Sequence, residues 1–185
     1  QEDRTPTYER TVQTTVANIS MRTDVGGPRS KYELNEDSLA LIANKDRTVI
    51  AIVDGAGGSG NNKLLFRAGR LASRVVDGAL IKAVREHKAD LGEAVHQEVV
   101  AQYHEYEGYA TGVIVDITSR DRKLFVRLQY GGDSRALTLR KKKVYDQGTT
   151  RFQNMAQKAV DQKIIAPHEY YDHPRLNVIT GGFGL

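Results

Sequence analysis

The sequence predicts an α+β fold in which antiparallel strands pack against helices. Short apolar runs follow one another in pairs joined by brief polar turns, which is the pattern of consecutive β-hairpins. Between two of these pairs lies a long stretch whose apolar residues recur at the helical period. Hairpins connect antiparallel strands, and a helix pair of this length must cover one face of a sheet. A simple alternation of parallel strands and helices is therefore not expected.

The expected strands are short runs of apolar or β-branched residues. Residues 11–20 are rich in threonine, valine and isoleucine, so they are expected to form one entering strand. The polar residues 44–47 separate two apolar runs and are expected to form a hairpin turn. In chain order, the expected strands are 11–20, 38–44, 48–53, 111–118, 123–130 and the two strands of a hairpin over 135–146.

Three segments have the helical period, and they cover about 62–86, 90–105 and 152–163. In the first, three arginines occupy the face opposite to the apolar residues, and Gly78 interrupts the pattern at a cost in helix propensity. The three arginines are Arg67, Arg70 and Arg74. The residues expected to face the core are Leu64, Leu65, Ala68, Leu71, Ala72, Val75, Val76, Ala79 and Leu80.

Length and composition indicate one soluble domain. A chain of 185 residues can build a two-layer core, and we expect residues 1–185 to form a single domain. No apolar run approaches the roughly 20 residues of a membrane helix, and the N-terminus lacks the apolar core of a signal peptide. The absence of cysteine excludes disulfides, zinc–thiolate sites and thiol chemistry. A cytoplasmic protein without a membrane segment is expected.

The charge pattern gives no sign of nucleic-acid binding. The net charge of +4 is mild, and much of it comes from the basic run 140–143 between two short strands. A nucleic-acid surface needs more basic residues and interleaved aromatic ones. The run is therefore interpreted as the solvated tip of a hairpin.

Acidic residues stand at the ends of three expected strands. Asp54 follows the apolar run 48–53 and opens a loop that is nearly all glycine, where backbone groups can approach a ligand closely. Glu36 and Asp37 precede another apolar run, and Asp133 leaves a third one. Carboxylates gathered at strand ends favour a hard-cation site built from oxygen ligands.

Other interpretations of the glycine loop are possible. Residues 55–60 match G-x-G-x-x-G, but Asp54 would place a negative charge beside a pyrophosphate, and the preceding strands form a hairpin instead of a βαβ unit. A P-loop is excluded, because Asn61 and Asn62 occupy the lysine and Ser/Thr positions. Asp54 could also be only a helix N-cap, and Asp133 could be a turn residue that pairs with Arg135.

Short motifs rich in glycine and acidic residues follow one another along the chain. They are Thr23-Asp-Val-Gly26 with Asn35-Glu-Asp-Ser38, Val53-Asp-Gly-Ala-Gly-Gly58, Gly108-Tyr-Ala-Thr-Gly112, Gly131-Gly-Asp-Ser-Arg-Ala136, and Ile164-Ile-Ala-Pro-His-Glu169 with His173-Pro-Arg-Leu-Asn-Val-Ile-Thr180. In this order the sequence resembles the metal-dependent protein serine/threonine phosphatases of type 2C, the PPM family. Each motif is modest alone, whereas five in register are specific.

The resemblance implies a sandwich of two antiparallel sheets flanked by helices, with a pair of Mn²⁺ or Mg²⁺ ions at one end. It assigns Asp54 as the ligand that bridges both ions, with the Gly55 carbonyl beside it. Glu36 and Asp37 would add carboxylates directly or through water, and Asp133 would bind an additional, weaker ion. The implied reaction is hydrolysis of phosphoserine or phosphothreonine on a phosphoprotein by a metal-activated water. In this scheme Asp54, Glu36 and Asp37 are the catalytic residues.

The sequence departs from the family pattern in three places. Tyr32 stands where many members have a phosphate-binding arginine, so Arg29 or Lys31 is expected to bind the substrate phosphate. Ala56 replaces a histidine that many members carry after the Asp-Gly pair.

The third departure is at the end of the chain. It stops at Leu185, without the two further metal-binding aspartates of the family, so the C-terminal strands of the domain are expected to be missing. The alternative function is a non-catalytic, phosphatase-like binding module with an incomplete metal site.

Overall fold

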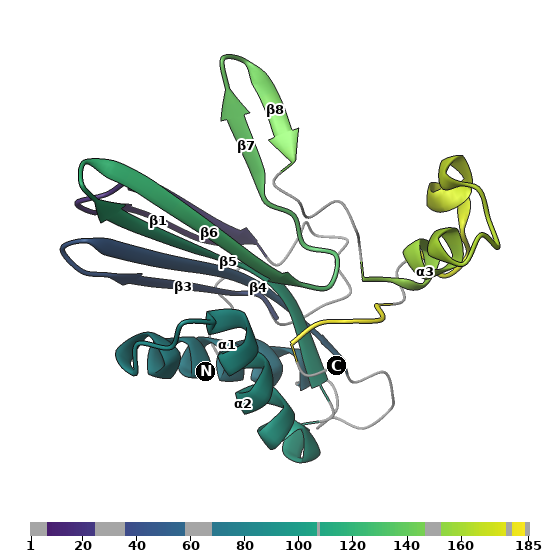
Figure 1. Ribbon diagram of the computed structural model, residues 1–185. Helices are drawn as coiled ribbons and strands as arrows, with labels where there is room; N and C mark the ends of the chain where they lie inside the picture. Colours follow the sequence, from purple (N-terminus) through teal and green to yellow (C-terminus); the bar gives the residue numbers. More distant parts are fainter. Residues whose placement is uncertain are drawn as a thin grey trace.

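The computed structural model describes residues 7–24, 36–57, 68–106, 108–146, 153–176 and 179–183. These segments form antiparallel sheets flanked by helices, so the predicted α+β class is confirmed. The centre is a four-stranded antiparallel sheet in the order β3-β4-β5-β6 (Figure 1). Its strands are β3 (Ser38–Ala43), β4 (Arg47–Gly57), β5 (Gly108–Arg120) and β6 (Lys123–Gly131).

Two helices cover one face of this sheet, as Figure 1 shows. They are α1 (Ala68–Arg85) and α2 (Leu91–Tyr106), and α1 packs mainly on β4 and β5. The side chains of a strand alternate between its two faces, so Val49, Ala51 and Val53 all point toward the helices and are buried. The alternate residues of the strand, Ile50, Ile52 and Asp54, point to the opposite face. None of the helices in the described ranges is both long and apolar enough to span a bilayer.

The first hairpin corrects the sequence prediction. The expected single strand 11–20 is wrong, because the chain reverses at 14–17 between β1 (Thr7–Gln13) and β2 (Asn18–Asp24). The Thr14 hydroxyl makes this reversal possible: it accepts hydrogen bonds from the N–H groups of Val16 and Ala17 and donates to the Ala17 carbonyl. The turn also contacts the four-stranded sheet, since Thr48 Oγ1 lies 3.2 Å from Thr14 Oγ1.

The expected hairpin at 135–146 is present as β7 (Leu137–Arg140) and β8 (Lys143–Asp146). It projects away from the four-stranded sheet on the side opposite the helices (Figure 1). Lys141 and Lys142 have positive φ angles, as in the two-residue turns of tight hairpins, and the basic tip is exposed as expected. Leu137, Leu139 and Val144 are also exposed.

The last predicted helix, expected at 152–163, is shorter than expected. Helix α3 (Met155–Asp161) begins where Asn154 caps it, because Asn154 Oδ1 accepts a 2.9 Å hydrogen bond from the Gln157 N–H. The same side chain donates to the hydroxyl of Tyr170 in the 3₁₀ helix η2 (Pro167–Asp172). Beyond η2, Phe183 forms a β-bridge with Ala110 at the start of β5.

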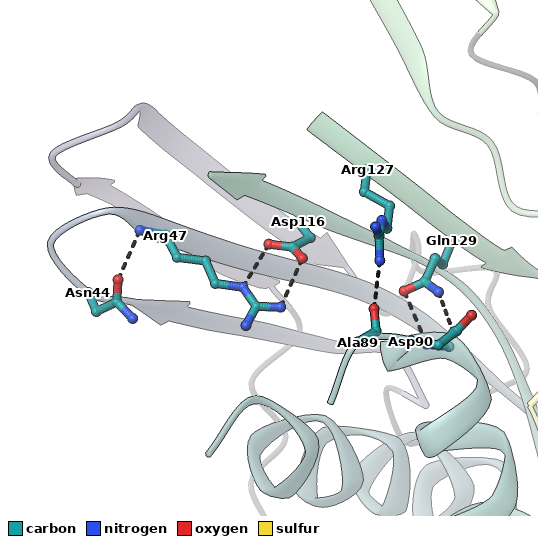
Figure 2. A network of polar contacts seen from close by, with 8 residues as sticks. Asn44, Arg47, Ala89, Asp90, Asp116, Arg127 and Gln129 are labelled. Atoms are coloured by element: carbon teal, nitrogen blue, oxygen red, sulfur yellow. Dashed lines mark hydrogen bonds and ion pairs between the residues drawn. The ribbon is translucent and has the colours of Figure 1, made fainter. Parts of the chain in front are cut away.

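A polar network joins the sheet to the start of α2 (Figure 2). Arg47 and Asp116 form a bidentate ion pair with N···O distances of 2.9 and 2.8 Å. Farther along, Arg127 donates to the Ala89 carbonyl, while Gln129 accepts from the Gly92 N–H and donates to Asp90. The edge strand β6 therefore holds the loop that leads into α2.

We expect Asp90→Ala to lower the free energy of unfolding by about 1–2 kcal/mol. Asp90 caps α2 by accepting a hydrogen bond from the Glu93 N–H, and it also accepts one from Gln129. Urea denaturation would measure the loss. Glu86→Ala is the control, because the exposed Glu86 side chain pairs with Lys88 at the surface, and removal of such a pair should change little. Equal losses in the two variants would contradict a capping role.

Candidate active site

Strand register brings the two acidic motifs of the N-terminal half to one end of the four-stranded sheet. Glu36 and Asp37 directly precede β3, whose first residue, Ser38, pairs with Val53 of β4. Asp54 follows Val53, so the strand ends deliver the acidic residues side by side. The Asp37 and Asp54 carboxyls lie within hydrogen-bonding reach of each other, a contact that requires a proton on one of them.

Asp133 reaches the same end of the sheet from β6. The chain leaves β6 through Gly132, which has a φ of +88° and packs so tightly that an added Cβ would lie 2.4 Å from the Thr111 side chain. Gln153 accepts a 2.7 Å hydrogen bond from the Gly132 N–H and fixes this turn. Asp54 and Thr111 are direct partners across β4 and β5. The negative charge of Asp133 is consequently close enough to act on Asp54.

Burial and mutual repulsion disfavour the charged forms of the carboxyl groups in this cluster. The pKa of Glu36 is raised to about 7, first by desolvation and then by the charges of Asp54 and Asp37. The pKa of Asp54 is raised to about 6, first by desolvation and then by Asp37 and Asp133. Asp54 keeps much of its surface in contact with solvent, yet surrounding protein atoms still displace enough water to disfavour its charge. A cation placed among these carboxylates would remove the repulsion.

Sequence reasoning missed two residues that interact with the cluster, Thr23 and Tyr109. Thr23 Oγ1 donates a 2.9 Å hydrogen bond to Asp37 Oδ2 and so orients that carboxylate. The pKa of Tyr109 in β5 is raised by burial and by the negative charges of Asp133 and Asp54. Thr23 begins the motif Thr23–Gly26, but nothing in the sequence indicates that it orients Asp37. A threonine in a strand is explained by β-propensity alone.

Gly55 fixes the backbone geometry behind Asp54. A Cβ on Gly55 would lie 2.0 Å from the Gly69 carbonyl oxygen and 2.8 Å from the Glu36 carbonyl oxygen. Three backbone segments therefore meet at this position: β4, the first turn of α1 and the residues before β3. Only glycine permits this approach. The packing ties the first and second acidic motifs to each other and to the helix layer.

The donor set fits a divalent ion such as Mn²⁺ or Mg²⁺. The groups are carboxylates, which are the ligands that hard cations prefer, and their raised pKa values show that the charged forms lack compensation. Nevertheless, among the residues that the structure describes, no three acidic or histidine side chains converge as closely as ligands around one ion. Apart from the contact between Asp37 and Asp54, these carboxylates act on one another through their charges.

Other predicted site residues fall outside this cluster or outside the description. Arg29 and Lys31, expected to bind phosphate, lie outside the described residues, as does Tyr32. His173, the first residue of the last quoted motif, accepts a local hydrogen bond at Nδ1 from the Arg175 N–H.

The raised carboxyl pKa values predict a pH dependence of stability. A carboxyl whose pKa is higher in the folded state stabilises the fold fully below its unfolded pKa, and this stabilisation is lost as pH rises through the folded pKa. For Glu36 the window runs from the ordinary value of 4.5 to about 7. In chelator, we expect the free energy of unfolding to fall by about 1–2 kcal/mol across this window, after allowance for solvent screening.

Glu36→Gln should flatten this dependence, because the amide does not titrate. Denaturation at several pH values would measure it, with Glu93→Gln on the exposed face of α2 as control. The interpretation fails if wild type and Glu36→Gln lose stability equally as pH rises.

Comparison with known proteins identifies the fold. No protein-family model and no curated protein matches the sequence. Solved structures do match. The serine/threonine phosphatase Stp1 from Staphylococcus aureus has a TM-score of 0.61 and 21% identity, covering 96% of this chain and 65% of that one. The PPM phosphatase MsPP from Mycobacterium smegmatis, in complex with cacodylate, has a TM-score of 0.57 and 20% identity, covering 97% and 67%.

A third match is the catalytic domain of the phosphatase PstP in complex with two manganese ions. Its TM-score is 0.52 at 22% identity, and the match covers 96% of this chain and 66% of that one. The chain therefore has the fold of PPM serine/threonine phosphatases and spans about two thirds of the length of these structures. The resemblance noted in the sequence is confirmed at the level of the fold.

Proposed function

We propose that this chain carries the metal-binding strand ends of a PPM-type phosphatase and hydrolyses phosphoserine or phosphothreonine on proteins with Mn²⁺ or Mg²⁺. One observation carries the proposal: four carboxyl groups lie close enough at one end of the sheet for their charges to act on one another. They belong to Glu36, Asp37, Asp54 and Asp133. They lie in a fold shared with phosphatases, one of which binds two manganese ions.

Each residue of the cluster has a proposed task. Asp54, with the Gly55 carbonyl, Glu36 and Asp37, would hold the ions, and Asp133 would hold a peripheral one. Such a metal pair supplies an activated water and neutralises charge on the phosphoryl oxygens. Thr23 keeps Asp37 in one orientation. Partial burial of Glu36 and Asp54 weakens screening by water, which strengthens their attraction for cations. Arg29 or Lys31 is proposed to bind the substrate phosphate.

A second candidate is a non-catalytic, phosphatase-like module that binds a phosphoprotein. It is favoured by the lack, within the described ranges, of three side chains that converge as metal ligands do. In this case Mn²⁺ would bind weakly or at one site, because fewer carboxylates offset the repulsion between two dications.

The experiment measures hydrolysis of p-nitrophenyl phosphate and of a phosphothreonine peptide, together with Mn²⁺ binding by calorimetry. We expect turnover that requires added Mn²⁺ and is abolished by EDTA. Full activity in chelator would contradict the metal-dependent mechanism. Mn²⁺ binding and phosphopeptide binding without turnover would favour the second candidate.

A further inference from the structure

Tyr109 lies beside the carboxylate cluster but is not one of the proposed metal ligands. It is the second residue of β5 and pairs with Ala56 of β4, while Asp54 pairs with Thr111, two residues farther along β5. Because residues two apart in a strand share a face of the sheet, Tyr109 projects from the same face as Asp54. An aromatic side chain can reach such a diagonal neighbour on the adjacent strand. The register therefore places the phenol ring within reach of the Asp54 carboxyl.

The turn after β6 brings Asp133 to the same part of the sheet. The chain on either side of Asp133 contacts Thr111: the preceding glycine packs against the Thr111 side chain, and the Ser134 hydroxyl donates a 3.3 Å hydrogen bond to Thr111 Oγ1. Thr111 is the next residue after Tyr109 on this face of β5. Burial raises the pKa of Tyr109, and the negative charges of Asp133 and Asp54 raise it further. The phenol therefore lies near both carboxyl groups.

The hydroxyl of Tyr109 is available as a hydrogen-bond donor. In the described part of the chain it bonds to no other residue, and every fully buried polar side-chain atom there has a partner. The hydroxyl must therefore be open to solvent, although the side chain is partly buried. Because its pKa is raised, the phenol stays protonated throughout the neutral range and keeps its hydrogen.

A neutral donor suits this position better than a cation does. A lysine or arginine beside two carboxylates would pair with them and compete with a metal ion for the same oxygens. A phenol donates a hydrogen bond without adding charge, and hydrogen bonds to a charged acceptor are stronger than those between neutral groups. The oxygens of a phosphoryl group are acceptors of this kind. Since the Tyr109 hydroxyl bonds to neither carboxyl, its hydrogen remains for a ligand.

We infer that the Tyr109 hydroxyl donates a hydrogen bond to a phosphoryl oxygen of the substrate. This inference rests on the proposed function, because it requires the substrate phosphate to lie beside the carboxylate cluster. Tyr109 then holds the phosphoryl group, while the carboxylates of the cluster would hold the ions.

Tyr109→Phe tests this role, because it removes the hydroxyl and keeps the ring that packs on β5. We expect it to weaken the binding of inorganic phosphate, measured by calorimetry in the presence of Mn²⁺, by about 10–100-fold, which corresponds to one hydrogen bond to a charged group. The value of kcat/KM for p-nitrophenyl phosphate should fall by a similar factor. The affinity for Mn²⁺ alone should be unchanged, because the hydroxyl bonds to neither carboxyl.

Tyr145→Phe is the matched control. It removes the same hydroxyl from an exposed tyrosine of β8, in the hairpin that projects away from the four-stranded sheet (Figure 1). Phosphate binding and turnover should both stay at the wild-type level. Thermal unfolding of the two variants confirms that each is folded.

The inference is overturned if Tyr109→Phe binds phosphate like wild type, or if the wild-type protein binds no phosphate. Equal losses of Mn²⁺ and phosphate affinity would also overturn it, because the hydroxyl would then orient the carboxylates instead of contacting the substrate. A different result separates the proposed function from this inference. Phosphate binding that depends on Tyr109, without any hydrolysis by the wild-type protein, would contradict the phosphatase activity and support the contact.

Discussion

Asp54→Asn should reduce Mn²⁺-dependent hydrolysis by far more than Asp133→Asn does. Asp54 lies at the centre of the carboxylate cluster. Asp37 is within hydrogen-bonding reach of Asp54, and the charge of Asp54 interacts with those of Glu36 and Asp133. Neutralising Asp54 would remove one negative charge from the carboxylates proposed to hold the ions. We expect a loss beyond the roughly 10–100-fold that removal of an outer group costs, and a loss within that range for Asp133→Asn.

The measurement is turnover of the phosphothreonine peptide at saturating Mn²⁺, with calorimetry of Mn²⁺ binding to each variant. Asp116→Asn is the acidic control, because Asp116 pairs with Arg47 on the helix-covered face and has no proposed part in metal binding. If Asp54→Asn and Asp133→Asn behave alike, the assigned roles of the two aspartates are wrong even where metal dependence holds.

A stability measurement separates this prediction from simple misfolding. In chelator, Asp54→Asn should be at least as stable as wild type, since the substitution removes one member of a set of mutually repelling carboxylates. An inactive variant that keeps its stability has lost a ligand and not its fold. A destabilised one would show instead that Asp54 supports the strand end structurally.

The sequence predicted the order of strands and helices better than their limits. The strand expected at 48–53 extends to Gly57, because the backbone of β4 continues to pair with β5 as far as Gly57 and Gly108. Apolar side chains mark where a strand is buried, whereas backbone pairing decides where it ends. The reversal at 14–17 escaped prediction for the related reason that a threonine hydroxyl, and no glycine or proline, stabilises the turn.

The acidic residues of the site could be named from sequence, but their grouping could not be derived from spacing alone. Asp133 lies far from Asp54 in the chain, and only the pairing of β4 with β5 and β5 with β6 brings the two strand ends together. The orienting bond from Thr23 depends on where the first hairpin ends, which the pattern of β-branched residues misplaced. The phosphate-binding assignment to Arg29 or Lys31 stays a prediction.

Gly55→Ala should be the most destabilising single-methyl substitution at the site. The added Cβ would collide with backbone oxygens of both Gly69 and Glu36, at 2.0 and 2.8 Å, and neither oxygen belongs to a side chain that could rotate away. Relief requires α1 or the segment before β3 to shift as a unit. We expect a loss at or above the upper end of the about 1–3 kcal/mol typical of overpacking.

Gly78→Ala provides the matched control, because it adds the same methyl group to a glycine of α1, the helix that packs against Gly55. A Cβ there meets nothing within 4 Å, so the only effect is improved helix propensity, a gain of about 0.5–1 kcal/mol. Urea denaturation of both variants measures the contrast. Opposite signs would show that close backbone approach, and not glycine content as such, holds the acidic motifs against α1. A mild effect of Gly55→Ala would mean that this junction is loose, and Mn²⁺ affinity should then survive the substitution.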